Sequence, residues 1–238
     1  MVSKNQIRKS GAALRDFQGS GRSVEALEPE EVGALSTAVD VVSDYRASFS
    51  QPLLSVRMSA TSFANTLGYG DEAMIAQRLK RLPRIISKLE RITTMNITTM
   101  GDIGGCRVIV PGIEAQRAIR RHMERQWGDK IRDLKDYVAA PKPDGYRALH
   151  VEVVRNDRRI EVQLRTQRQH RWADTVERIS RRIGIELKWG QGHDDHQVSA
   201  FLRDWASALA LLDEGSEVPD ELRDRLEEYL GATDGLGL

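Results

Sequence analysis

The feature that most constrains the fold is strict alternation of apolar and polar residues on both sides of a turn at 156–159. The alternating positions are Leu149, His150, Val151, Glu152 and Val153 before the turn, and Ile160, Glu161, Val162, Gln163, Leu164 and Arg165 after it. Because successive side chains of a strand point to opposite faces, this pattern predicts a β-hairpin with one apolar and one polar face. Taken alone, a polar face is as consistent with exposure to solvent as with a binding site.

Other segments repeat apolar residues with helical or strand spacing. The expected strands are 107–110, 131–138, 149–154 and 160–165, and the expected helices are 30–48, 113–126, 168–183, 195–213 and 219–230. We also expect a helix from the N-cap Asp71, with Pro83 opening a further set of turns, and irregular structure over 55–70. This order predicts an α+β fold, in which helices flank a small, mainly antiparallel mixed sheet.

Length and composition favour an ordinary globular enzyme-sized chain. The 238 residues are 40% hydrophobic and 30% charged, which is enough for one substantial core. No run approaches the roughly 18 apolar residues of a membrane helix, and the N-terminus lacks the apolar stretch of a signal peptide. The single cysteine, Cys106, is expected to be buried, and a cytoplasmic protein without a membrane partner is predicted.

Charge divides the chain into four expected parts. Residues 1–22 carry five basic residues and one acidic residue and are interpreted as a solvated basic arm, with contact to a phosphate backbone as the alternative. A helical region at 23–70 and a catalytic core at 71–190 follow, and the helices of 191–238 are acidic. Within the last part, the run from His193 to His196 is interpreted as a helix N-cap rather than as a metal site.

Two polar segments point to phosphate chemistry. Asp102 lies in a glycine-rich entry to an expected strand, and Glu161 lies on the polar face of the hairpin. Proteins hold Mg²⁺ against substrate phosphates with one or two such carboxylates. Upstream basic residues would neutralise a polyphosphate: Arg78, Lys80, Arg84 and Lys88. This combination suits phosphoryl transfer, and the chain has neither a Walker A motif nor a kinase glycine loop.

Five segments together resemble the synthetase domain of the RelA/SpoT family. They are RLKRLPRIISKL (78–89), GDIGGCRVIV (101–110), KDYVAAPKPDGYRALH (135–150), IEVQLRT (160–166) and QHRWADTVE (169–177). The resemblance covers about 78–190. It implies an enzyme that transfers the β,γ-pyrophosphate of ATP to a ribose 3′-hydroxyl, releases AMP and requires Mg²⁺.

The resemblance also implies roles for individual residues. Asp102 and Glu161 would bind Mg²⁺, and Glu161 would lie near the attacking hydroxyl as the base. ATP would be bound by Arg78, Lys80, Lys88 and Arg107. The acceptor would be bound by Lys142, Tyr146, His150, Gln163 and Arg165, with Tyr146 stacking on its base.

The sequence says less about the identity of the acceptor than about the type of reaction. The 77 residues before Arg78 leave no room for the family's hydrolase domain, and two segments look closer to toxin-type small synthetases. Asp144 and Ala148 depart from the family pattern, so the tRNA 3′-CCA end is narrowly favoured over GDP or GTP. A toxin of this type implies an antitoxin partner, and the oligomeric state is left open. The hypothesis from another class is a catalytically dead nucleotide- or RNA-binding module.

Overall fold

The computed structural model describes residues 2–183 and 196–233 and is built around one five-stranded sheet. The strands are β1 (Met74–Leu79), β2 (Gly104–Val110), β3 (Ile131–Asp136), β4 (Leu149–Arg155) and β5 (Arg158–Thr166). They lie in the order β1-β2-β5-β4-β3, with β2 and β5 parallel and the other neighbours antiparallel. The predicted α+β class and mainly antiparallel mixed sheet are confirmed.

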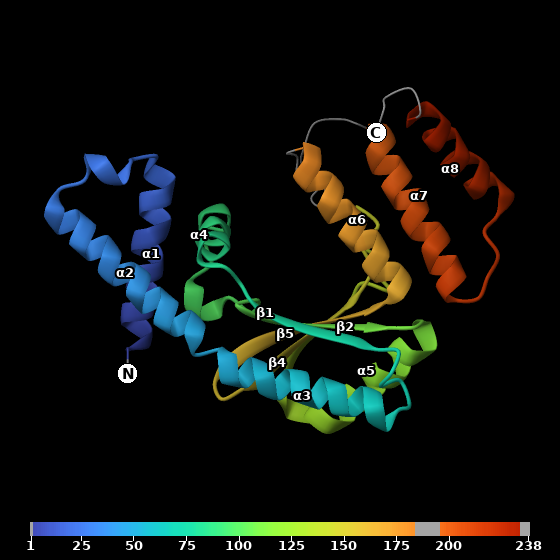
Figure 1. The fold of residues 1–238 in the computed structure, drawn as a ribbon, viewed down its shortest axis with the longest axis horizontal. Helices are drawn as coiled ribbons and strands as arrows, with labels where there is room; N and C mark the ends of the chain where they lie inside the picture. The colour runs from blue at the N-terminus through green and yellow to red at the C-terminus, as the bar shows by residue number, and fades with distance from the viewer. Residues whose placement is uncertain (1, 184–195, 234–238) are drawn as a thin grey trace.

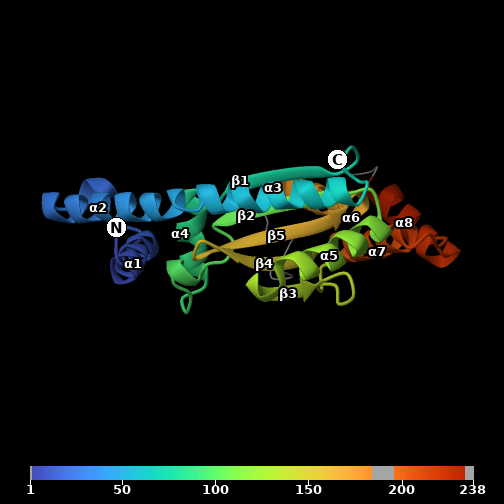
Figure 2. The ribbon, with the colours of Figure 1, turned by 90° about the horizontal axis from the view of Figure 1, so that it is seen from below.

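Helices cover one face of the sheet and flank the other. They are α1 (Lys4–Ser20), α2 (Pro29–Ala47), α3 (Ser50–Thr66), α4 (Leu82–Arg91), α5 (Ile113–Trp127), α6 (Gln167–Ile183), α7 (His196–Asp213) and α8 (Asp220–Thr233). Figure 2 shows α3 and α5 lying across one face. On the opposite side, α4 with α1 and α2 stands at one end of the sheet, and α6 to α8 stand at the other (Figure 1). Among the described helices, none is long and apolar enough to cross a membrane.

The hairpin forms as its alternation predicts. Asn156 and Asp157 adopt left-handed backbone conformations, with φ of 46° and 58°, which fits a tight two-residue turn between antiparallel strands. This turn sets the register, so that His150 lies opposite Gln163 and Glu152 lies opposite Glu161. The polar residues of β4 and β5 therefore share one face of the sheet.

Two predicted elements are wrong. The segment 55–70, expected to be irregular, is mostly helix α3, because Val56, Ala60 and Ala64 form a buried stripe against the core. The first part of the helix expected from Asp71 is instead strand β1, which pairs with β2 along its whole length. Pro83 does lie in the first turn of the following helix, α4, as predicted.

The basic N-terminal segment is also more ordered than an arm. Residues Lys4–Ser20 form helix α1, which has Ile7, Gly11 and Leu14 buried and packs against α2 and α4. A β-carbon on Gly11 would lie 2.9 Å from Ile97, so α1 approaches that neighbouring segment closely. The interpretation of residues 4–20 as a solvated arm is therefore wrong, whereas the four-part division of the chain stays a prediction.

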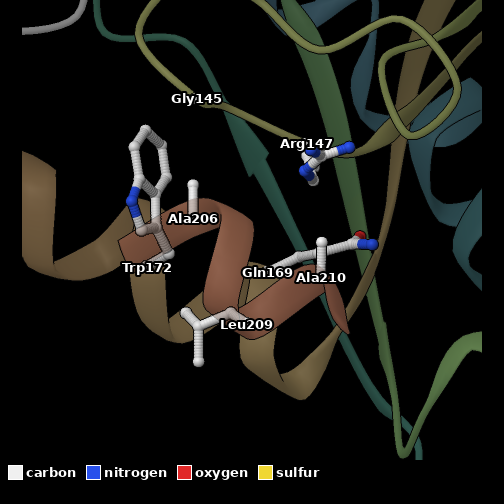
Figure 3. Close-up of a pocket in the computed structure, with 7 residues that line it drawn as sticks. All are labelled: Gly145, Arg147, Gln169, Trp172, Ala206, Leu209 and Ala210. Carbon is white, nitrogen blue, oxygen red and sulfur yellow. The ribbon is translucent and has the colours of Figure 1, made fainter. Parts of the chain in front are cut away.

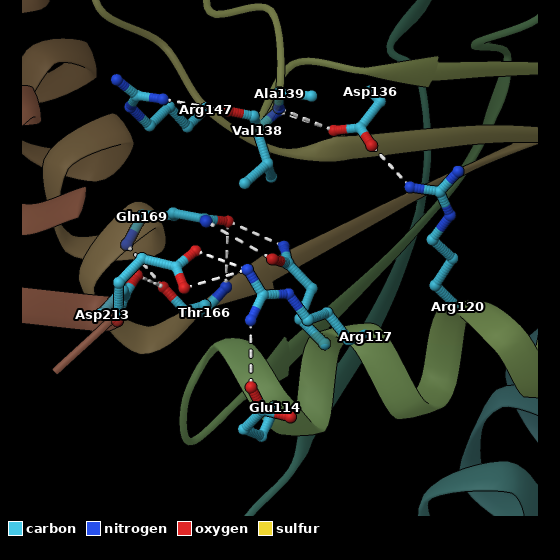
Figure 4. A network of polar contacts seen from close by, with 12 residues as sticks. Glu114, Arg117, Arg120, Asp136, Val138, Ala139, Arg147, Thr166, Gln169 and Asp213 are labelled. Carbon is cyan, nitrogen blue, oxygen red and sulfur yellow. Dashed lines mark hydrogen bonds and ion pairs between the residues drawn. The ribbon is translucent and has the colours of Figure 1, made fainter. Parts of the chain in front are cut away.

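A second apolar cluster joins α6 and α7 to the loop before β4. It contains Tyr146, Ala148, Trp172, Ala173, Val176, Leu202 and Ala206. The indole of Trp172 donates a 2.9 Å hydrogen bond to the carbonyl of Leu202, as expected of a core residue. At the other end of α7, Asp213 accepts a hydrogen bond from the hydroxyl of Thr166 at the end of β5 (Figure 4). The predicted cap at His193 to His196 lies outside the described residues, apart from the start of α7.

Candidate active site

Strand register brings the predicted polar residues onto the sheet face that α3 and α5 leave uncovered. Arg78 of β1 lies opposite Gly105 of β2, which lies beside Glu161 of β5. In the next row, Arg107 of β2 lies beside Gln163, which lies opposite His150 of β4. Residues in one row of neighbouring strands point to the same side. Four strands therefore contribute to a single charged surface.

Asp102 lies in the turn before β2, between two lysines. Lys80, just after β1, and Lys88 of α4 each place Nζ 2.8 Å from one of its carboxylate oxygens. Burial opposes ionisation of Asp102, but the two ammonium groups outweigh that effect and lower the pKa of the carboxyl below its usual value. The predicted carboxylate and two predicted ATP-binding lysines thus form one cluster.

Glu161 belongs to a closed circuit of hydrogen bonds. Its Oε1 lies 3.2 Å from Nδ1 of His150, and its Oε2 accepts a 2.8 Å bond from Nε2 of Gln163. Nε2 of His150 lies 2.6 Å from the hydroxyl of Tyr146. Nη2 of Arg165 donates to that hydroxyl at 2.8 Å and to Oε1 of Gln163 at 2.9 Å. Five residues that the sequence placed at the site are therefore joined directly.

The same contacts determine the charge of Glu161. Burial is the largest single influence and would raise its pKa, yet the hydrogen bond and charge of His150, together with the hydrogen bond from Gln163, outweigh burial, so that the pKa is lowered. The charge of Asp102 acts in the opposite direction on Glu161, which shows that the two carboxylates interact electrostatically. Both carboxylates are therefore ionised near neutral pH, and they lie close enough for the charge of Asp102 to affect Glu161.

Cations gather beside these carboxylates. Burial, with the positive charges of Arg165 and Arg78, lowers the pKa of Arg107. Buried Nε atoms of Arg107 and Arg165 have no hydrogen-bond partner among the described residues. Unsatisfied donors next to like charges are costly unless an anion binds there. The arrangement suits the phosphates of a nucleotide.

Tyr146 is more enclosed than a free stacking surface. Its side chain belongs to the second apolar cluster, and the residue is only 9% exposed. Nζ of Lys142 lies 5.0 Å from the Tyr146 ring and 4.7 Å from that of Tyr137. A pocket lined by Gly145, Trp172 and Ala206, among others, marks where this loop meets α6 and α7 (Figure 3).

The donor set of Asp102 and Glu161 fits a magnesium ion that is also bound by substrate phosphates. Hard carboxylate oxygens are ligands that Mg²⁺ prefers, and it commonly takes only one or two of them from the protein. The described residues contain no group of three or more histidine, cysteine or acidic side chains placed to hold a metal by themselves. Phosphate oxygens would have to complete the coordination.

Sequence reasoning missed three residues around this site. Glu152 lies opposite Glu161, and burial is the main cause that raises the pKa of its carboxyl. His170 of α6 has a buried Nδ1 without a partner among the described residues, and burial with the charges of Arg107 and Arg165 lowers its pKa. Arg46 of α2 donates a 2.7 Å hydrogen bond to the carbonyl of Lys80. The alternation in β4 already placed Glu152 on the polar face, and His170 lies in the segment 169–177 that resembles the RelA/SpoT family, whereas no local signal marked Arg46.

Solved structures with this architecture define the class of fold. Small alarmone synthetase 1 of Bacillus subtilis aligns with 78% of this chain and 97% of its own, with a TM-score of 0.59 and 20% identity. The same protein bound to its product pppGpp aligns with 72% of this chain and 94% of its own, with a TM-score of 0.58 and 20% identity. The chain therefore has the fold of the small alarmone synthetases.

Sequence comparison relates one part of the chain to a protein family. Residues 77–181 match the family described as a region found in RelA / SpoT proteins. Every predicted site residue from Arg78 to Arg165 lies within the matched segment.

Individual relatives are distant. A guanosine-3′,5′-bis(diphosphate) 3′-pyrophosphohydrolase of Aquifex aeolicus is 27% identical over 163 residues, which are 68% of this chain but only 22% of that protein. GTP pyrophosphokinase YjbM of Bacillus subtilis is 27% identical over 161 residues, covering 63% of this chain and 73% of the relative. An uncharacterized protein of Mycobacterium tuberculosis is 26% identical over 193 residues, covering 79% of this chain and 63% of the relative.

Proposed function

We propose that the chain is a pyrophosphokinase that transfers the β,γ-pyrophosphate of ATP to the ribose 3′-hydroxyl of GDP or GTP and releases AMP. The observation that carries this proposal is the pair of ionised carboxylates, Asp102 and Glu161, beside arginines on one sheet face. Among the described residues, no carboxylate forms an ion pair with Arg78, Arg107 or Arg165. A site with ionised carboxylates and with arginines that form no ion pair suits a polyphosphate substrate with a divalent cation.

The reaction assigns a task to each group. The bond between the β-phosphorus of ATP and the oxygen that bridges the α- and β-phosphates breaks, AMP leaves with that oxygen, and the 3′-oxygen bonds to the β-phosphorus. Glu161 receives the proton of the 3′-hydroxyl. Asp102 and Glu161 would hold magnesium, which supplies neutralisation of phosphate charge when it is bound.

Binding roles follow the positions of the cations. Lys80 and Lys88 would exchange their contacts with Asp102 for contacts with the phosphates of ATP, and Arg78 and Arg107 would hold its adenine and phosphates. The acceptor would contact Lys142, Tyr146, His150, Gln163 and Arg165. The relatives support GTP as acceptor, since one is a GTP pyrophosphokinase and a protein of similar fold has been solved bound to its product pppGpp.

The experiment is direct. The purified chain is incubated with magnesium and ATP labelled at the γ-phosphate, with GDP, GTP or deacylated tRNA present separately. We expect label to appear in a guanosine product, and AMP to form in equal amount. If no acceptor yields AMP, the chain is a nucleotide- or RNA-binding module and not an enzyme.

A second candidate acceptor is the 3′-CCA end of tRNA, which would make the chain a translation-inhibiting toxin with an antitoxin partner. The supporting observation is that α1 packs against α4, so that basic residues of both helices lie on neighbouring elements. These exposed residues are Lys4, Arg8, Lys9, Arg84 and Arg91. Such cations favour a phosphate backbone.

The two departures in sequence no longer support this candidate. The carboxylate of Asp144 accepts a 2.9 Å hydrogen bond from the backbone N–H of Tyr146, which is a turn-forming contact. Ala148 is fully buried in the second apolar cluster. Both residues therefore have structural roles here, and the tRNA proposal depends on the basic helices alone.

A further inference from the structure

The hydrogen-bond circuit around Glu161 has a defined direction. An arginine only donates, so Nη2 of Arg165 gives hydrogens to the hydroxyl oxygen of Tyr146 and to Oε1 of Gln163. The Tyr146 hydroxyl has then accepted one hydrogen and can direct its own to Nε2 of His150, 2.6 Å away. The donor and the acceptor of each hydrogen bond are therefore determined by the bond before it.

This direction selects one tautomer of His150. A neutral imidazole whose Nε2 accepts a hydrogen bond carries its hydrogen on Nδ1, the atom that lies 3.2 Å from Oε1 of Glu161. In the other tautomer, a nitrogen lone pair would face the carboxylate, and the Tyr146 hydroxyl would accept twice with its own hydrogen unplaced. Only the Nδ1–H tautomer pairs every donor of the circuit with an acceptor.

Packing fixes the position of the Tyr146 hydroxyl, which donates to His150 in this circuit. Tyr146 is 9% exposed, and its ring lies at a centroid distance of 6.3 Å from that of Trp172 of α6. The preceding Gly145 lies so close to α7 that a β-carbon there would be 2.8 Å from the β-carbon of Ala206. The position of the hydroxyl is therefore set by helices outside the sheet.

We propose that Tyr146 is a positioning residue, whose hydroxyl holds His150 in the Nδ1–H tautomer and thereby fixes the carboxylate of Glu161. The proposal rests on the proposed function, in which Glu161 receives the proton of the 3′-hydroxyl. It differs from the role that the sequence suggested, in which the ring of Tyr146 binds the acceptor base. A phenylalanine separates the two roles because it keeps the ring and removes the hydroxyl.

The kinetic test compares Tyr146→Phe with Tyr137→Phe. Tyr137 lies edge-on to both Tyr146 and His150, and its hydroxyl has no hydrogen bond among the described residues. We expect Tyr146→Phe to lower kcat about ten- to a hundredfold, the usual effect of removing a group that orients an active-site ligand. The KM for the acceptor should stay within about twofold, and Tyr137→Phe should leave both constants unchanged. Unchanged kcat in Tyr146→Phe, or a raised KM alone, would overturn the proposal.

A double-mutant cycle tests whether Tyr146 acts through His150. If it does, adding Tyr146→Phe to His150→Ala lowers kcat no further than His150→Ala alone. Independent losses that multiply would show a separate role for Tyr146 and contradict the proposal. Thermal unfolding of each variant confirms that the compared proteins are folded.

A spectroscopic readout is independent of activity. Nitrogen-15 NMR of the His150 ring reports which nitrogen carries hydrogen in the wild-type chain and in Tyr146→Phe. We expect a single Nδ1–H tautomer in the wild type and its loss in the variant, whereas the same tautomer in both would overturn the proposal. If the wild-type chain yields no AMP with any acceptor, the proposed function fails, and the NMR result still decides what the Tyr146 hydroxyl does.

Discussion

At the residue scale, the ionisation of Glu161 depends on its neighbours. Contacts with His150 and Gln163 together overcome a burial effect that would otherwise favour the protonated carboxyl. We predict that Glu161→Gln, which keeps the size of the side chain and removes its charge, lowers turnover by about 10²- to 10⁴-fold. The measurement is the steady-state rate of AMP formation at saturating ATP and acceptor.

Exposed Glu124 of α5 provides the control for this substitution, since α5 covers the opposite face of the sheet. Glu124→Gln should retain full activity, and both variants should unfold within a few degrees of the wild type. Residual activity of Glu161→Gln within about tenfold of wild type would remove Glu161 from the chemistry. The face of the hairpin would then be polar only because it is exposed to solvent.

Burial suppresses the reactivity of the Cys106 thiol. Burial in the core raises the pKa of its thiol to about 12. Since the thiolate is the reactive form, we predict that the native chain resists iodoacetamide at mildly alkaline pH, where a free cysteine reacts. In denaturant the single thiol should react fully. Rapid modification of the native chain, followed by mass spectrometry, would show that the core around β2 opens.

At the scale of elements, the contact between α7 and the Pro141–Tyr146 loop is tight and local. Gly145 has a φ of +90°, and a β-carbon there would meet the backbone of Arg203 at 3.2 Å as well as Ala206. We predict that Gly145→Ala destabilises the chain by about 1–3 kcal/mol, through backbone strain and overpacking. Chemical denaturation monitored by tryptophan fluorescence measures this change.

A second glycine, Gly33, serves as the control, because its replacement by alanine is expected to have the opposite effect on stability. Gly33 is an exposed residue in the second turn of α2, and a β-carbon there would have no neighbour within 4 Å. Gly33→Ala should therefore stabilise the chain by about 0.5–1 kcal/mol, because alanine is the better helix former. Equal effects of the two substitutions would mean that α7 does not press on the loop.

The two elements that were predicted wrongly, α3 and β1, differ in how much signal the sequence contains for them. In α3 the buried residues Leu53, Val56, Ala60 and Phe63 have helical spacing, so that the sequence does contain a signal for this helix, which the prediction of irregular structure overlooked. Strand β1 is an edge strand with mostly exposed side chains, so that it shows no alternation. The hairpin was predictable because one of its faces is buried and its turn is short.

The site was predictable to the extent that strand periodicity controls it. Alternation placed His150, Glu161 and Gln163 on one face, and the structure joins them by hydrogen bonds. The enclosure of Tyr146 was not predictable, since it depends on packing against Leu202 and Ala206, more than fifty positions further along the chain. Contacts of that separation leave no periodic signal in a single sequence.

At the scale of the whole molecule, the two candidate acceptors differ in how they respond to salt. A tRNA contacts many cations and releases counterions, so that its use should fall steeply as salt increases, whereas GTP in one pocket should respond less. We predict GTP as the preferred acceptor at low and moderate salt, measured by competition between the two acceptors. Efficient modification of tRNA with GTP untouched would instead support the toxin hypothesis.

The packing of α1 determines how the basic helices should be tested. Deletion of α1 would expose the buried side chains it packs against, so that neutralisation of exposed cations is the better design. Lys4→Gln with Lys9→Gln should weaken any use of tRNA and reduce its dependence on salt, while use of GTP remains unchanged. A loss of GTP turnover in this variant would place α1 in the nucleotide site.

The order of the strands also has a consequence for synthesis on the ribosome. The central strand of the sheet, β5, is the last one in the chain, and it joins β2 to β4 on its two sides. Until it has emerged, β2 and β4 each have an unpaired edge, and such edges invite pairing with other chains. Asp102 and Glu161 also cannot meet before that moment, so that a nascent chain remains inert until its last strand has been inserted.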